Sequence, residues 1–335
     1  MYHSHKDYSI EEIREHSRQI KKVLKKSSYY LTLIKRKYKS IAGYPTWESV
    51  ALDLACFMEI KETGLWKELD QSCKLLVIMG HITALENPPI YWINKDLMTS
   101  LLNTDIPEDT VLADLKPVLP FLFFMLPKGY IKDENGAELN WVGVRFIEKS
   151  KGVVSYKLLN GDYVHSQKVD SDRLSWVSCS SLMVGYSSTE GIPLSTENIN
   201  KFSSYATDAT ATSSGIFNES DSKLTNTVSK LVINILLLMQ YKPDFITDDN
   251  EISYTGTGFS KNKRKENLIN PRWIGKDFLI KKVKSKSTSA TSRPRDPSIY
   301  PYWVRGHWRR VVVGKLSEGK RKLKMIAPYL VIGDK

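Results

Sequence analysis

The sequence predicts an α+β protein with a helical N-terminal region, a central antiparallel sheet, a late core helix and a basic C-terminal β-hairpin. Three observations indicate this class: apolar residues at helical spacing in the first third, short strand patterns separated by turn signals in the middle, and one strongly apolar helical stretch after them. With 335 residues and 41% hydrophobic content, the chain can form a full core. We expect a helical region over residues 1–105, the sheet with its core helix over 106–245, and a basic arm with the hairpin over 246–335.

The N-terminal region is expected to contain three helices. Apolar residues recur at near-helical spacing among charged ones over Ser9–Lys39, where Ser9 can cap the first turn. The same spacing predicts a second helix over about Pro45–Lys61 and a third over about Leu65–Leu85.

The middle of the chain has the pattern of antiparallel strands. Prolines flank the apolar run Phe121–Leu126, which favours a buried strand over a helix. Asn135-Gly136 is a strong hairpin turn signal before Leu139–Ile147. Further strands are expected over Val153–Leu159, Tyr163–Val169 and Leu174–Cys179, and the Ser- and Thr-rich residues 187–222 are typical of a loop or linker.

Leu224–Tyr241 is apolar almost all round, which is typical of a helix buried in a core. The polar, basic sequence that follows is expected to form an irregular arm. Two short strands, Arg310–Val313 and Lys322–Ile326, then form the C-terminal hairpin.

Charge is distributed unevenly along the chain, which has a formal net charge of +12. Residues 1–40 contain 11 Lys and Arg against 4 Asp and Glu, and residues 261–335 contain 21 against 5, so these ends carry +7 and +16. Residues 41–260 therefore carry −11. The basic ends favour a polyanionic partner, although a solvated helix face explains the N-terminal end equally well.

Several function classes find no support in the sequence. Cys56, Cys73 and Cys179 are odd in number and far apart, so we expect neither disulfides nor a zinc site, and a reducing cytoplasm fits best. No secretory signal or membrane span is apparent. Because phosphate-binding loops, nucleophile elbows and calcium loops are also missing, we expect no metal and no cofactor.

The block from Trp303 to Arg310 is the most informative feature of the sequence. Arginine donates paired hydrogen bonds to phosphate and tryptophan stacks on unpaired bases, so their alternation favours binding of single-stranded RNA or DNA. Gly306 would allow close backbone approach or a positive φ angle. An alternative is equally open: the tryptophans anchor the hairpin to the core and the arginines are only solvated. The candidate nucleic-acid-binding residues are Trp303, Arg305, His307, Trp308, Arg309, Arg310, Lys320, Arg321, Lys322 and Lys324.

His307 is the one catalytic candidate, because imidazole titrates near neutral pH and can exchange protons with RNA. A metal-independent ribonuclease needs a second acid or base, and the sequence shows no obvious partner for His307. The residue pattern therefore favours a structural or RNA-contacting histidine over a catalytic one.

The C-terminal block also carries a family resemblance. Arg-Gly-His-Trp-Arg at residues 305–309 follows aromatic residues and Pro301, and precedes Gly314, a basic strand and the closing segment Ala327–Val331. This order resembles the C-terminus of the second type V-A anti-CRISPR family. The helical start, the central sheet and the late apolar helix ending near Pro243 are compatible with that family.

The resemblance implies an accessory protein of a phage, plasmid or integrated element. It implies action against a type V CRISPR effector during its synthesis, by recognising the emerging peptide and lowering the effector's messenger RNA; another nascent target is equally open. The expected partners are RNA or the ribosome and a nascent polypeptide, which the acidic centre would hold by edge-strand addition or in a groove. Two alternatives remain, a ribonuclease using His307 and a plain DNA-binding module of a phage or plasmid.

Overall fold

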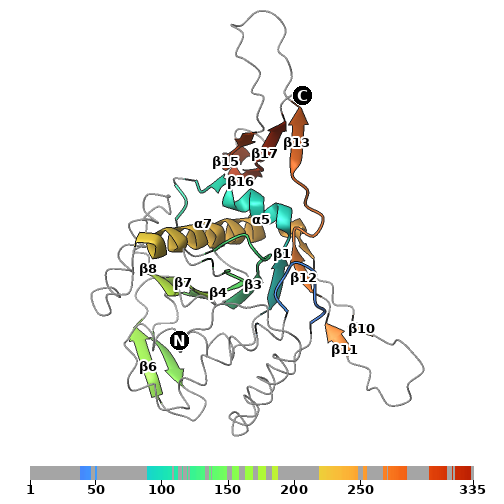
Figure 1. Ribbon diagram of the computed structural model, residues 1–335. Coiled ribbons are helices and arrows are strands. Elements are labelled where there is room, and N and C mark those ends of the chain that lie inside the picture. Colours follow the sequence, from blue (N-terminus) through green and yellow to red (C-terminus); the bar gives the residue numbers. More distant parts are fainter. Residues whose placement is uncertain are drawn as a thin grey trace, which may run out of the picture.

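The computed structural model describes the C-terminal three quarters of the chain with internal gaps (Figure 1). The described residues are 38–46, 50, 89–107, 109–111, 115, 119, 121–132, 136, 138–148, 153–157, 163–168, 173–178, 183–187, 219–247, 252–254, 267–269, 271–284, 302–314, 319 and 321–332. Apart from residues 38, 39, 45, 46 and 50, the three predicted N-terminal helices lie outside these residues, as does most of the Ser- and Thr-rich segment.

Seven strands form the central sheet. They are β1 (Ile90–Ile93), β3 (Phe121–Met125), β4 (Trp141–Ile147), β7 (Arg173–Ser178), β8 (Met183–Ser187), β9 (Ile246–Thr247) and β12 (Arg272–Ile274). Their order across the sheet is β8-β7-β4-β3-β1-β12-β9. Strands β3 and β4 are buried along their whole length, as the continuous apolar sequence of β3 predicts, and β4 buries Arg145 among its apolar residues.

The α+β class is confirmed, but the central sheet is mixed and not purely antiparallel. The pairs β3–β4, β4–β7 and β7–β8 are antiparallel, whereas β1 runs parallel to both β3 and β12. The sequence-based prediction missed β1 because Ile90–Ile93 falls in the region predicted to be helical. It missed β12 because Arg272–Ile274 is a three-residue strand in a strongly basic context.

The predicted strands of the middle region are confirmed with small shifts at their ends. Strands β5 (Val153–Lys157) and β6 (Tyr163–Lys168) form their own antiparallel pair, and β7 falls where a strand was predicted. The hairpin around Gly136 is present: Lys132 bridges to Glu138, and Gly136 has the positive φ of 80° that its turn requires.

Two α-helices cover one face of the sheet, α5 (Lys95–Leu102) and α7 (Glu219–Tyr241), and a short 3-10 helix, η5 (Pro243–Phe245), follows α7 (Figure 1). Asn94 caps α5, since its side chain accepts hydrogen bonds from Asp96 N at 2.8 Å and Leu97 N at 3.1 Å. Helix α7 is buried from Leu231 to Met239 because the sheet lies on one side of it and the C-terminal strands lie on the other (Figure 1). None of the described helices is long and apolar enough to cross a membrane.

The C-terminal region contains more strands than the sequence predicted. They are β10 (Ile252–Tyr254), β11 (Asn267–Ile269), β13 (Lys281–Lys284), β14 (Tyr302–Val304), β15 (Gly306–Val312), β16 (Arg321–Ile326) and β17 (Tyr329–Ile332), and they are joined by β2 (Thr104–Asp105), which follows α5. They form two three-stranded sheets, β13-β17-β14 and β16-β15-β2, and the pair β10-β11. One hydrophobic cluster includes Tyr91, Leu238 and Leu323, so elements from all three expected regions share a core.

Candidate nucleic-acid interface

The C-terminal strands form one bent two-stranded ribbon. Strand β15 follows β14 after the single residue Arg305, and β17 follows β16 after Ala327 and Pro328. Trp303 pairs with Leu330 and His307 with Ile326, so each strand advances four residues through the bend and the register is unchanged. We call residues 302–312 and 321–332 the C-terminal ribbon.

Trp308 anchors the ribbon to α7. The indole is 6% exposed, and its Nε1 donates a hydrogen bond of 2.9 Å to Oδ1 of Asn234, which is fully buried. The Asn234 amide nitrogen donates to the carbonyls of Leu101 at 3.2 Å and Thr104 at 2.9 Å. One buried side chain therefore ties the ribbon, the end of α5 and β2 together.

Gly306 allows this contact because the ribbon bends tightly at its position. A Cβ atom there would lie 2.5 Å from Thr104 Oγ1, 2.6 Å from Pro328 Cδ and 2.9 Å from Pro328 N. Of the two predicted roles of Gly306, close backbone approach is the one observed; its φ is not positive.

Alternate residues of the ribbon point away from α7, as a strand's period of two requires. We call their side chains the outer face: Trp303, Arg305, His307, Arg309, Lys322 and Lys324. All six are exposed, whereas Trp308 and Leu323 on the opposite face are buried. The ribbon thus brings six of the ten predicted binding residues onto one surface.

Positive charges lie directly opposite one another on the outer face. Arg309 is paired in register with Lys324, and Lys322 is the next residue on the same face of β16. Within the described part of the chain, no carboxylate lies within salt-bridge distance of these three side chains. A directly opposed like-charge pair costs roughly 0.2 to 1 kcal/mol in an antiparallel sheet, so the arrangement favours an anionic ligand.

The other predicted binding residues have different environments. Trp308 is inside the core, so its ring is not presented to a base as the stacking role requires. Arg310 Nε lies 2.7 Å from Asp109 Oδ2, on the opposite side of β15 from Arg309. Arg321 is exposed at the end of β16, and Lys320 is outside the described residues. Trp303 is 39% exposed and is the tryptophan available to solvent.

His307 lies beside a carboxylate that the sequence did not indicate. Strand β2 pairs with β15 in parallel and places Asp105 next to His307. The two Asp105 oxygens lie 2.8 Å from Lys230 Nζ and 3.9 Å from Arg305. Asp105 and His307, together with Asp109, Arg309 and Arg310, border a hollow of about 510 Å³. Within the described residues, no group of three potential ligands is arranged to bind a metal.

Two residues that contribute to this surface were not predicted from the sequence. Lys282 on β13 is in register with Leu330 and thus with Trp303, which extends the basic row across three strands. Asn234, which positions the ribbon, stands as a single amide within the apolar run of α7. A lone polar residue in an apolar helix was the signal for a buried hydrogen bond.

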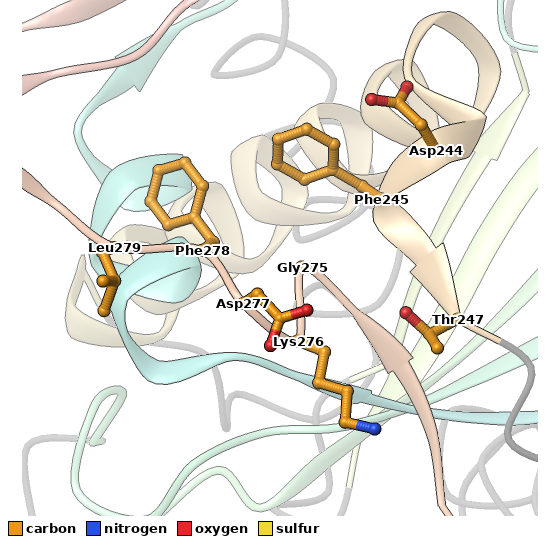
Figure 2. A pocket seen from close by; sticks show the side chains of 8 residues that line it. All are labelled: Asp244, Phe245, Thr247, Gly275, Lys276, Asp277, Phe278 and Leu279. Atoms are coloured by element: carbon orange, nitrogen blue, oxygen red, sulfur yellow. The ribbon is translucent and has the colours of Figure 1, made fainter.

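A second hollow, of about 310 Å³, lies at the carboxyl ends of the parallel strands β1 and β12 (Figure 2). Figure 2 shows Phe245 and Phe278 side by side; their ring centroids are 6.0 Å apart, and the exposed residues Asp244 and Asp277 line the same hollow. Gly275 has φ of 68°, and its N–H donates to Phe245 O at 2.7 Å. These contacts hold the loop against β9, the last strand of the described sheet.

The loop that lines the hollow is also hydrogen-bonded to residues at the start of α5. The Asn94 side-chain amide donates to Lys276 O at 2.9 Å, and Asp96 accepts from Ile280 N at 3.2 Å. The pocket therefore combines two phenyl rings, two carboxylates and a sheet edge within a fixed loop.

Comparison with known proteins gives one family. The AcrVA2-like family model, described as the anti-CRISPR type V subtype A2 family, matches residues 91–333. The matched span contains the central sheet, both helices, the hollow of Figure 2 and the C-terminal ribbon. A search among curated proteins found no match.

Proposed function

Because the chain belongs to the anti-CRISPR type V subtype A2 family, we propose that it recognises a nascent polypeptide, such as a type V CRISPR effector, and promotes loss of the encoding messenger RNA. The proposed activity belongs to a protein of a phage, plasmid or other mobile element, and it takes place in the cytoplasm, where the target is translated. The observation that supports this proposal most directly is the cationic outer face, because messenger RNA and the ribosome both present phosphate groups to their partners.

The proposal gives the outer face the role of docking on RNA or the ribosome. Arg305, Arg309 and Lys324 are exposed there, and the opposed pair Arg309–Lys324 is destabilising until an anion neutralises it. The rigid connection through Trp308 and Asn234 keeps these charges in a fixed arrangement on the body of the protein.

The hollow in Figure 2 is the proposed surface for the nascent polypeptide. An extended peptide can add to the edge of β9 through main-chain hydrogen bonds, while the pocket selects its side chains. Phe245 and Phe278 suit an apolar side chain, and Asp244 and Asp277 suit a basic one. Peptide and RNA would therefore bind at separate surfaces, and the peptide surface carries the exposed Lys276 as well as its two carboxylates.

Co-expression with a type V effector tests the proposal. The message should fall equally for the native and a synonymously recoded 5′ coding region, because both encode the same peptide. It should be preserved when the encoded N-terminal peptide is changed. Loss that follows the nucleotide sequence, or no loss for any type V effector, contradicts peptide recognition.

Variants of the two surfaces assign their roles in the same assay. Asp244→Asn with Asp277→Asn should preserve the target message by weakening peptide binding, while leaving RNA binding by the purified protein unchanged. Glu138→Gln is the control for each single variant, Asp244→Asn or Asp277→Asn, because it removes one charge from the Gly136 hairpin and does not line the hollow. An equal effect of the control would show that the response reflects net charge alone.

A ribonuclease is the second candidate, and the observation that favours it is the position of Asp105 beside His307. Such an enzyme uses a histidine with a second proton-transferring group. Incubation of purified protein with RNA, next to His307→Ala, separates the candidates: cleavage lost in the variant supports direct catalysis, and intact RNA with both proteins excludes it under those conditions.

A further inference from the structure

The outer face of the C-terminal ribbon combines an exposed aromatic ring with a row of cations. We propose that it is a platform for a short segment of single-stranded RNA, with Trp303 as the base-stacking residue and Arg305, Arg309, Lys322, Lys324 and Lys282 as phosphate contacts. This inference rests on the proposed function and specifies the RNA class and the contacts at the same surface.

The two tryptophans of the ribbon differ in their exposure to solvent. Trp308 is 6% exposed and has its indole N–H bonded to Asn234, so only a rearrangement of the core would offer its ring to a base. Trp303 is 39% exposed at the start of the same ribbon, although tryptophan usually lies mostly buried. Base stacking uses a flat ring that is open to solvent, and of these two tryptophans Trp303 is the one that meets this condition.

The spacing of side chains along the ribbon is similar to the spacing of phosphates in an extended single strand. Residues two apart on a strand are separated by about 6.6 Å, which is similar to the distance between successive phosphates of an extended single strand. Arg305, His307 and Arg309 follow Trp303 at this interval without a change of register. The six residue steps from Trp303 to Arg309 measure about 20 Å along the chain, and the straight distance is shorter because the ribbon bends at Gly306, so this strand has room for roughly three nucleotides.

The exposed ring of Trp303 among the cations favours unpaired bases over a contact by charge alone. Lys282, Leu330 and Trp303 form one row across β13, β17 and β14, so a cation and an exposed ring lie two strands apart beside a partly buried leucine. A duplex keeps its bases stacked inside and gives Trp303 nothing to stack on, whereas unpaired bases do. Duplex binding is therefore an alternative outcome of the test.

Fluorescence anisotropy of a labelled oligouridine of about twelve nucleotides, titrated with the full chain, tests the platform. Trp303→Leu should weaken binding on the order of 5- to 150-fold, the range for loss of one stacked base, and Trp303→Phe should restore part of it. Tyr130→Leu is the matched control, because Tyr130 is 37% exposed but lies in the loop before the Gly136 hairpin. An unchanged affinity in Trp303→Leu overturns the stacking role.

Salt dependence tests the cations. Five phosphate contacts predict that the logarithm of the binding constant falls by roughly 3.5 per logarithmic unit of salt, and Arg309→Gln with Lys324→Gln should lower this slope by about 1.4. Lys132→Gln, in the hairpin, should not change it. The double variant should also fold at least as stably as the parent, because it removes a like-charge pair, so weaker binding cannot be attributed to unfolding.

The outcomes separate this platform from the proposed function. Loss of the target message in cells without binding of the oligouridine overturns the platform and leaves the regulator in place. Binding that needs Trp303, together with an unaffected message, overturns the regulator and leaves the platform. Tighter binding of duplex RNA or duplex DNA than of the single strand rejects the single-stranded assignment.

Discussion

The indole Nε1 of Trp308 donates a 2.9 Å hydrogen bond to Oδ1 of Asn234, and both side chains are buried between the C-terminal ribbon and α7. The edge of the Tyr241 ring lies against the same indole, with centroids 6.4 Å apart. A buried hydrogen bond thus joins the basic C-terminal ribbon to the apolar helix α7.

Asn234→Ala should destabilise the protein strongly. The substitution leaves the Trp308 N–H and the carbonyls of Leu101 and Thr104 without the Asn234 partner in a buried region. Each buried polar group left unpaired costs roughly 1 to 3 kcal/mol, so with three groups affected we expect a loss of about 3 kcal/mol or more in the free energy of unfolding, measured with urea.

Thr227→Ala on the same helix is the comparison, since the Thr227 hydroxyl is bonded only to the carbonyl of Lys223 in its own helix, at 2.9 Å, and is partly exposed. Its effect should stay within about 0.5 kcal/mol. Equal effects of the two substitutions would mean that the Asn234 contacts contribute little.

Gly306→Ala should also destabilise the fold, by about 2 to 3 kcal/mol, because the added Cβ meets the backbone nitrogen of Pro328 and not merely a movable side chain. Gly136→Ala has nothing within 4 Å of the added atom and a φ of 80°, so it carries only backbone strain on the order of 1 kcal/mol. Thermal or urea unfolding should rank Gly306→Ala as the more damaging change, and the reverse order would contradict the steric explanation.

The sequence predicted those elements whose signals are local. Gly136 predicted the turn, and the apolar run Phe121–Leu126 predicted the buried strand. The apolar residues on all sides of α7 predicted a helix in the core. The parallel pairing of β1 with β12 joins segments about 180 residues apart, so neither segment carries a sign of it. Short strands of three or four residues are decided by tertiary pairing more than by propensity.

The same limit applies to the site. The arginines and lysines of the ribbon were predicted from composition, but which tryptophan is exposed depends on what packs against each face of β15. That in turn depends on Asn234 and Thr104, which are far away in the sequence. Residue types thus indicated the ligand class, whereas the fold decides which side chains are available to it.

Tyr44→Phe tests how the segment before β1 is attached. The Tyr44 hydroxyl donates to the carbonyl of Ile93, and its ring meets Trp273 edge to face at 5.6 Å. Burial raises the pKa of the Tyr44 phenol well above its usual value, with a smaller contribution from Tyr130, so the hydroxyl stays protonated and can donate.

Removing the Tyr44 hydroxyl should cost about 1 to 2 kcal/mol in the free energy of unfolding, because the Ile93 carbonyl loses this donor in a buried strand. Tyr130→Phe, at a 37% exposed position, should change stability by less than about 0.5 kcal/mol. A neutral Tyr44→Phe would show that water replaces the lost donor.

Asp109→Asn should tighten RNA binding if the outer face is the platform. Asp109 borders the same hollow as His307 and Arg309, and its carboxylate holds Arg310 Nε at 2.7 Å. Neutralising Asp109 removes a negative charge next to the platform and frees Arg310 from its ion pair. Affinity for the oligouridine should therefore rise about 2- to 5-fold at low salt. The gain should disappear at high salt, where screening shortens the reach of the charge to a few ångströms.

Stability should change by less than about 1 kcal/mol, since the Asp109 side chain is 62% exposed and exposed ion pairs contribute little. Glu138→Gln removes the same charge from a 3.5 Å pair with Lys132 in the hairpin and should leave RNA affinity unchanged. If both variants tighten binding equally, the protein responds to net charge and not to a field at the ribbon. If Asp109→Asn weakens binding, Asp109 holds Arg310 in the orientation that RNA needs, which would extend the platform to the opposite side of β15.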